Sequence, residues 1–158
     1  FDAEDYGRHE AEWRDAVSGE ETWALGSKYW AHNPHVAGYK ARYGILLDIV
    51  GAPESRFCLE GFSMHFAPGI VKKVWSAAHR QGFARYFPYN EGGSITDDHV
   101  NVNKILGIPC IDIINYDPNS PNGFGEHHHT MKDDMEWISP ATLKTVGQTV
   151  LSVIYSEK

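Results

Sequence analysis

Tyr43-Gly44-Ile45-Leu46-Leu47-Asp48-Ile49-Val50 is a continuous apolar run, and Gly51-Ala52-Pro53 closes it. A strand with one solvent-exposed face alternates apolar and polar residues, whereas a strand covered on both faces, as in a parallel sheet, does not. Ile108-Pro109-Cys110-Ile111-Asp112-Ile113-Ile114 has the same character. The two stretches therefore predict buried strands of a largely parallel sheet.

One helix is expected before the first strand and another after it. Ser18-Gly19-Glu20-Glu21 has the form of a capping box, and the helix that it predicts carries on one face Trp23, Gly26 and Trp30. Pro68 opens another helix that ends near Gly82. The inward side of this helix is predicted to consist of Val71, Val74, Trp75 and Ala78.

Two further helices complete the pattern. A short helix is expected from Thr96 to Leu106, where Gly107 stops it, and Ser139-Pro140 begins the last helix. The apolar stripe of the last helix is predicted to be Leu143, Val146, Gly147, Val150, Leu151 and Ile154. Strands that alternate with helices predict an α/β fold, a three-layer sandwich with a central mixed, largely parallel sheet flanked by helices. No linker or repeat interrupts the chain, so residues 1–158 are expected to form a single domain.

Composition excludes several classes of function. The 158 residues carry a formal net charge of -7, which does not favour binding to nucleic acid or anionic membranes, because these need clustered Lys and Arg. No apolar run approaches the roughly 20 residues that span a bilayer. Cys58 and Cys110 are too few and too far apart for a zinc ribbon or a redox pair, so both are predicted to be buried thiols.

Four acidic or histidine-containing signatures carry the candidate chemistry. They are, in order, Phe1-Asp2-Ala3-Glu4-Asp5, the strand-end Asp48, Thr96-Asp97-Asp98-His99 and His127-His128-His129-Thr130. Each has an ordinary interpretation, such as a solvated loop, a helix start with dipole-complementing acids, or an adventitious metal binder. Carboxylates and an imidazole at strand ends are also what a zinc hydrolase or transferase site is made from.

In this order and spacing, the signatures resemble those of the bacterial glutaminyl-peptide cyclotransferase-like proteins, within the wider M28-type family of zinc-dependent aminopeptidases. The resemblance runs from Phe1 to the closing helix near Tyr155. Members of that family carry a sizeable segment upstream. The resemblance therefore implies that the chain corresponds to the C-terminal portion of a zinc exopeptidase-like domain whose N-terminal part is missing.

The resemblance assigns roles to five residues. Glu4 matches the general acid/base, while Asp5 matches a zinc ligand that is Glu in the family. His129, in the His-Thr pair, matches another zinc ligand. Aminopeptidases carry Ser-Asp-His where this chain has Asp97-Asp98-His99, and cyclotransferases carry Asp-Asp-His. In the cyclotransferases the first acid of that motif, matching Asp97, is linked to the acid matching Asp48.

Three aromatic side chains are candidates for the substrate pocket. His128 stands where the family usually has a Trp that walls the pocket, and Phe124 in the same loop is a candidate replacement. Trp13 lies near the place of a second pocket Trp, although its offset differs. The other four Trp residues are expected to pack in the core or on the surface.

The activity expected from the resemblance is conversion of an N-terminal Gln to pyroglutamate with release of ammonia, with one Zn²⁺ ion. The first alternative is a metallo-aminopeptidase with two zinc ions, in which Asp48 becomes a ligand. The second is a degenerate binding module without catalysis. The expected partners are peptide or protein N-termini. The resemblance also implies an exported protein, periplasmic or extracellular, with a lipid anchor in an upstream segment as one route.

Overall fold

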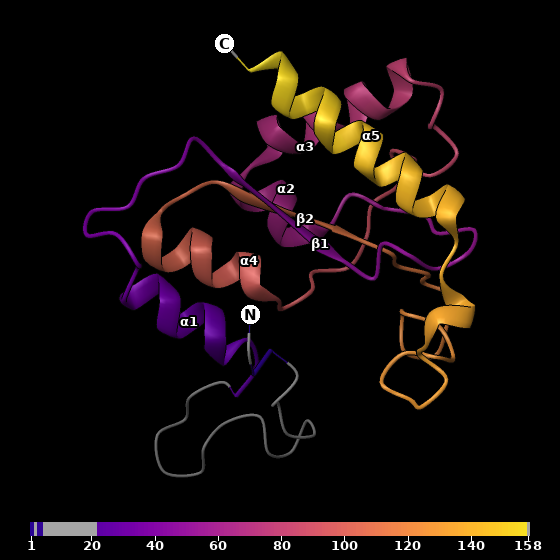
Figure 1. Ribbon diagram of the computed structural model, residues 1–158, viewed down its shortest axis with the longest axis horizontal. Coiled ribbons are helices and arrows are strands. Elements are labelled where there is room, and N and C mark those ends of the chain that lie inside the picture. The colour runs from indigo at the N-terminus through magenta and orange to yellow at the C-terminus, as the bar shows by residue number, and fades with distance from the viewer. Residues whose placement is uncertain (2, 5–21, 158) are drawn as a thin grey trace.

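A computed structural model of the chain describes residues 1, 3, 4 and 22–157 (Figure 1). The helices and strands follow in the order α1 (Leu25–His32), β1 (Gly44–Asp48), α2 (Gly61–Phe66), α3 (Pro68–Arg80), α4 (Asp98–Asn101), the π-helical turn η1 (Val102–Leu106), β2 (Cys110–Ile114), the 3₁₀ turn η2 (Met135–Trp137) and α5 (Pro140–Ser156).

The two predicted strands pair in parallel. Gly44 lies opposite Cys110 and Asp48 lies opposite Ile114, so both strands end at the same edge. Strand β2 is buried along its whole length, and β1 is mostly half-buried. In Figure 1, α1 and α4 lie on one side of the strand pair, and α3 and α5 lie on the other. A parallel sheet between helices confirms the predicted α/β class.

The core lies between β2, α3 and α5. Phe87 packs against Phe57 and Trp75, with ring centroids 5.0 and 5.2 Å apart. Helix α3 begins at Pro68, as predicted. It buries the expected residues Val71, Val74, Trp75 and Ala78.

The predicted inward stripe of α5 is wrong in part. Leu143, Leu151 and Ile154 are 43%, 52% and 53% exposed. The residues that α5 buries are Thr142, Thr145, Val146, Thr149 and Val153. Three of these are threonines, which the predicted apolar stripe does not include.

Intrahelical hydrogen bonds explain two of the buried threonines. The hydroxyl of Thr145 donates to the carbonyl oxygen of Ala141 at 2.9 Å, and that of Thr149 donates to the carbonyl oxygen of Thr145 at 2.8 Å. A hydroxyl that is satisfied inside its own helix avoids the cost of an unpaired buried polar group, so its methyl group can face the core.

Helix α1 begins later than the capping box predicted. The box at 18–21 lies outside the described residues, and the helix starts at Leu25 after Ala24, which has a left-handed φ of 52°. Trp23 therefore precedes the helix instead of lying on its face. This correction matters for the site, because it leaves the Trp23 ring in a turn.

The short helix expected from Thr96 to Leu106 is divided. Asp97 is the N-cap of α4, a regular helix of four residues, and the chain continues as η1. Gly107 stops it with a φ of 64°, as predicted. Helix α2 was not predicted. It begins after Glu60, whose side chain caps it.

Candidate active site

The turn before α1 joins three of the segments that carry candidate site residues. The backbone N–H of Ala24 donates to the carbonyl oxygen of Glu4 at 3.0 Å. The Trp23 ring is stacked on that of His129, with centroids 6.5 Å apart. The Asn101 side chain, on α4, donates to the carbonyl oxygen of Ala24 at 3.0 Å. Glu4, His129 and the helix that follows Asp97 thus meet at one turn.

The histidine loop gathers aromatic rings beside that turn. The His128 and His129 rings stack with centroids 3.8 Å apart, and Phe124 lies 4.6 Å from His128. His127 is buried and stacks on Trp137. The structure therefore brings two of the three predicted pocket residues, His128 and Phe124, together with the predicted ligand His129. It adds Trp23, which sequence reasoning had assigned to packing.

Asp97, the N-cap of α4, is a buried acid. It is 5% exposed, and its carboxylate accepts the backbone N–H of Asp98 at 2.5 Å. Burial, helped by the nearby charges of Asp48 and Asp98, raises the pKa of Asp97 to about 6, although that hydrogen bond lowers it. A carboxyl group with this pKa can hold or release a proton near neutral pH. The direct link between Asp97 and Asp48 that the resemblance implies stays a prediction.

A second buried group lies behind Asp97, and sequence reasoning missed two of its members. Glu60, His99 and Asp112 are 2%, 0% and 1% exposed. The Nε2 atom of His99 lies 3.1 Å from a Glu60 carboxylate oxygen, and its Nδ1 atom lies 4.0 Å from one of Asp112.

The pKa values of Glu60 and Asp112 are shifted in opposite directions. Burial alone would raise the pKa of Glu60, but hydrogen bonds from His99, Ser63 and the backbone of Ile95 lower it to about 2. Burial raises the pKa of Asp112 well above its usual range, and neighbouring carboxylates add to the rise. Glu60 is thus ionised at neutral pH, while Asp112 favours its neutral form. An acid inside the apolar stretch Ile111-Asp112-Ile113 was the available sequence signal.

Two of the predicted site residues, Asp5 and Trp13, lie outside the described residues. Asp48 ends β1 and is half-buried. His129 is exposed, with a left-handed φ of 57°. The roles predicted for these residues remain predictions.

The donor types suit zinc, because an imidazole and carboxylates are common Zn²⁺ ligands. Among residues 1, 3, 4 and 22–157, however, no three His, Cys, Asp or Glu side chains are grouped so that they could hold a metal ion. Of the two predicted ligands, this part of the chain includes His129. A complete coordination set needs donors in addition to those described.

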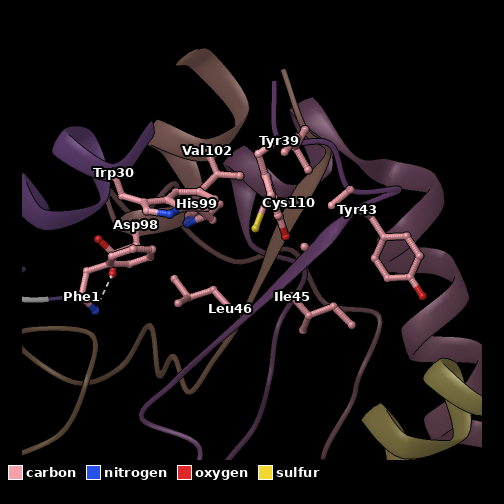
Figure 2. Close-up of a pocket in the computed structure, with 13 residues that line it drawn as sticks. Phe1, Trp30, Tyr39, Tyr43, Ile45, Leu46, Asp98, His99, Val102 and Cys110 are labelled. Atoms are coloured by element: carbon pink, nitrogen blue, oxygen red, sulfur yellow. Dashed lines mark ion pairs between the residues drawn. The ribbon is translucent and has the colours of Figure 1, made fainter. Parts of the chain in front are cut away.

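A pocket of about 190 Å³ lies beside β1, and its wall includes Asp98 and His99 (Figure 2). Phe1 lies at Asp98, with its amino nitrogen 3.5 Å from a carboxylate oxygen, and its ring is 5.6 Å from that of Trp30. The predicted catalytic residues Glu4, Asp48 and Asp97 do not line this pocket. It therefore borders the start of α4 without being the predicted reaction site.

Two further expectations can be compared with the structure. Cys58 and Cys110 are both buried free thiols, as predicted. Within the part of the chain that the structure describes, no helix has the length and apolar character needed to cross a membrane.

Solved structures of high similarity include glutaminyl cyclases and an exopeptidase. A Porphyromonas gingivalis glutaminyl cyclase is 49% identical, with a TM-score of 0.91, and the match covers 99% of this chain and 54% of that one. For a Tannerella forsythia glutaminyl cyclase the identity is 51%, the TM-score 0.90 and the coverage 100% and 53%. For a Zn-dependent exopeptidase from Parabacteroides distasonis these values are 51%, 0.92, 99% and 53%.

The chain spans about half the length of these solved chains. No curated protein matches it. The family model described as peptidase family M28 matches residues 16–154, which is most of the chain. This match and the likeness to the solved structures confirm the resemblance predicted from the four signatures. The chain belongs to peptidase family M28.

Proposed function

We propose that the protein is a zinc-dependent glutaminyl-peptide cyclotransferase, which converts an N-terminal Gln to pyroglutamate and releases ammonia. The observation that carries this proposal is the buried Asp97 carboxyl group, with its pKa near 6 and its electrostatic link to Asp48. An aminopeptidase-type Ser at this position would supply no second acid. The glutaminyl cyclases among the similar structures support the same activity.

The reaction needs one proton to move between two nitrogen atoms of the substrate. The α-amine attacks the side-chain amide carbon, so a new N–C bond forms and the bond to the amide nitrogen breaks. Glu4 accepts the proton from the α-amine and gives it to the leaving nitrogen, which departs as ammonia. No net proton or water is consumed.

Asp48 and Asp97 hold the α-amine in place for that attack. Burial and, to a smaller extent, the charge of Asp48 raise the pKa of Asp97, and on this basis we propose that the two carboxyl groups share a proton near neutral pH. A shared proton leaves acceptor oxygens that can bind the amine N–H groups. Holding the attacking amine close to the amide carbon and correctly oriented accelerates ring closure by a large factor.

Asp5 and His129 are the residues that we propose to hold zinc, together with a donor beyond those described. Zinc, when bound, polarises the side-chain amide carbonyl and so favours attack at its carbon atom. We propose one ion for the cyclotransferase. Zinc in the name of the P. distasonis relative supports the choice of metal.

The rings beside His129 are proposed to wall the Gln side chain. Trp23 stacks on His129, and Phe124 packs against His128. Flat apolar rings on both sides would restrict the width of the accepted side chain. Trp13 keeps its sequence-based assignment as a further candidate.

An incubation with two peptides tests the proposal. The full-length protein is loaded with zinc and given one peptide that begins with Gln and one that begins with Leu, and both are followed by mass spectrometry. We expect the Gln peptide to lose ammonia without shortening and the Leu peptide to stay intact. Removal of the first residue from the Leu peptide would instead establish an aminopeptidase.

The aminopeptidase is the second candidate, and the similarity to a Zn-dependent exopeptidase favours it. In that case Glu4 would act on water, and Asp48 would be a ligand of a second zinc ion. The Asp-Asp-His form of the motif argues against it. No change in either peptide would favour the degenerate binding module.

We propose that residues 1–158 belong to a single α/β domain, because one core joins β2 with α3 and α5. We also propose that the protein is exported, to the periplasm or the cell exterior, and acts on peptide or protein N-termini there. Cell fractionation with an antibody against the chain tests the location. Recovery in the cytoplasmic fraction alone would contradict it.

A further inference from the structure

Behind the proposed catalytic acids lies a buried polar group that the reaction scheme does not use. Glu60, His99 and Asp112 belong to the N-cap of α2, to α4 and to β2, and each is almost completely buried. The Glu60 carboxylate is the centre of this group. It accepts hydrogen bonds from both the backbone and side chains of other segments.

Glu60 contacts the chain on both sides of Asp97. One carboxylate oxygen accepts the backbone N–H of Ile95 at 2.9 Å, two residues before Asp97. The other oxygen lies 3.1 Å from Nε2 of His99, two residues after it. The short segment that carries Asp97 is therefore held at each end by a single buried anion.

Backbone pairing fixes Glu60 itself to the same segment. Gly61 donates its N–H to the carbonyl oxygen of Gly93 at 2.9 Å, and Gly92 donates to that of Leu59 at 2.8 Å. The approach is close, because a Cβ atom at Gly61 would lie 2.2 Å from the Ser94 hydroxyl. The chain around Glu60 and the chain leading to Asp97 thus form one packed unit.

A hydroxyl extends the unit to the sheet. Ser63 donates its side-chain O–H to Glu60 at 2.6 Å and accepts the backbone N–H of Asp112, in β2, at 2.9 Å. The unit therefore connects the segment that carries Asp97 to strand β2. A reactive acid at the start of a four-residue helix gains a rigid support in this way.

Burying these polar groups costs more folding free energy than a purely structural connection would need. Several acids surround one buried imidazole, and both carboxylate oxygens of Asp112 and the Nδ1 atom of His99 have no hydrogen-bond partner within the described part of the chain. Apolar side chains of similar size would usually connect the same elements at lower cost. Ionisable groups that are buried beside a site and have perturbed pKa values are candidates for a role in its chemistry.

We propose that Glu60 is a positioning residue for Asp97, which it holds through Ile95 and His99 in the orientation that the reaction requires. The proposal deepens the proposed cyclotransferase function and, for its kinetic part, rests on it. Glu60 does not touch the substrate in this scheme. Its effect on the rate passes through the Asp97 carboxyl group.

A double-mutant cycle tests that dependence. Glu60→Gln keeps the size of the side chain, and we expect it to lower kcat/KM for a Gln peptide by roughly tenfold to a hundredfold. In an Asp97→Asn background the same change should cause almost no further loss, because residues that act through one another are not additive. A full additional loss in that background would overturn the proposal.

A matched control shows whether the loss depends on the position of the carboxylate that is removed or only on the loss of one negative charge. Glu54→Gln also removes one carboxylate, but Glu54 is exposed and pairs only with Arg85 among the described contacts. It should leave kcat/KM unchanged. If Glu60→Gln does not fold, His99→Gln tests the link from its other end, and its loss should likewise vanish in the Asp97→Asn background.

An NMR titration tests the proposal without activity. With carboxyl-¹³C aspartate, Glu60→Gln should move the titration midpoint of Asp97 by roughly half a pH unit or more, whereas Glu54→Gln should not. An unchanged midpoint would contradict a positioning role. Absence of cyclisation by the wild-type protein would refute the proposed function alone, and the titration would still decide the role of Glu60.

Discussion

At the scale of single residues, Glu4 carries the proposed proton transfer. Its carbonyl oxygen is fixed by the N–H of Ala24, so the backbone that presents the side chain is anchored at the start of α1. Replacing Glu4 by Gln keeps the shape but removes the base. We expect kcat to fall by roughly a hundredfold or more, while the zinc content stays that of the wild type.

The control for Glu4 is Glu136→Gln, which changes an exposed acid in η2. Steady-state kinetics with a Gln peptide and metal analysis of the same samples check both variants. A Glu4→Gln variant that keeps the wild-type kcat would remove Glu4 from the mechanism. Loss of zinc along with activity would indicate a ligand role instead.

Sequence reasoning at this scale yielded candidates where the residues of a motif are contiguous in the chain. The Asp97-Asp98-His99 motif and the His128-His129 pair were found, because each is a local pattern. Glu60 was not found, since its partner His99 lies 39 positions away and only the fold brings them together. Trp23 was assigned to packing for the same reason.

At the scale of elements, the approach of α2 to the segment before Asp97 depends on a glycine. A Cβ atom at Gly61 would lie 2.2 Å from the Ser94 hydroxyl and 3.1 Å from its Cα atom, so the Ser94 side chain must shift and its backbone must give way slightly. We expect Gly61→Ala to lower the unfolding free energy by about 1–3 kcal/mol. It should also reduce kcat/KM, because the displaced segment carries Asp97.

Gly69 provides the matched control in the first turn of α3. An added Cβ atom there meets nothing within 4 Å. Gly69→Ala should be neutral or stabilise the protein by up to about 1 kcal/mol, because alanine is the better helix former. Urea unfolding of both variants measures the difference, and equal unfolding free energies would show that the close approach is not required.

Helix positions were predictable from caps and prolines, but helix faces were less so. Pro68 and Ser139-Pro140 mark starts that the structure confirms. The inward face of α5 was misassigned, because threonines that satisfy their own hydroxyls replace leucines at the core. A hydrophobic period does not reveal such internal hydrogen bonds.

At the scale of the whole molecule, buried acids make stability depend on pH. The folded-state pKa of Asp97, about 6, lies above the usual value of 3.8. An acid with a raised pKa stabilises the fold below its unfolded pKa, and that contribution is lost as pH rises through the folded value. Glu60, with its pKa lowered to about 2, acts in the opposite sense below pH 4.5.

The comparison of wild type with Asp97→Asn isolates the first effect. In zinc-free buffer, the stability of the wild type relative to the variant should fall by up to roughly 3 kcal/mol between pH 4 and pH 7. Urea unfolding at a series of pH values measures it. A difference that stays constant over this range would show that Asp97 titrates normally.

The fold class was predictable from two apolar strands because both are closed by clear turn signals and separated by helices. The way in which loops meet was not. The contact of the 124–129 loop with the turn at Trp23 joins distant parts of the chain, and no local pattern encodes it. The proposed site depends on that contact as much as on the motifs.

The central claim is that Asp97 makes this protein a cyclotransferase, and the release of ammonia from a Gln peptide by wild type and by Asp97→Asn tests it most directly. We predict one ammonia per peptide without shortening for the wild type, and a rate lower by roughly a hundredfold or more for the folded variant. An Asp97→Asn protein that releases ammonia at the wild-type rate would contradict the account.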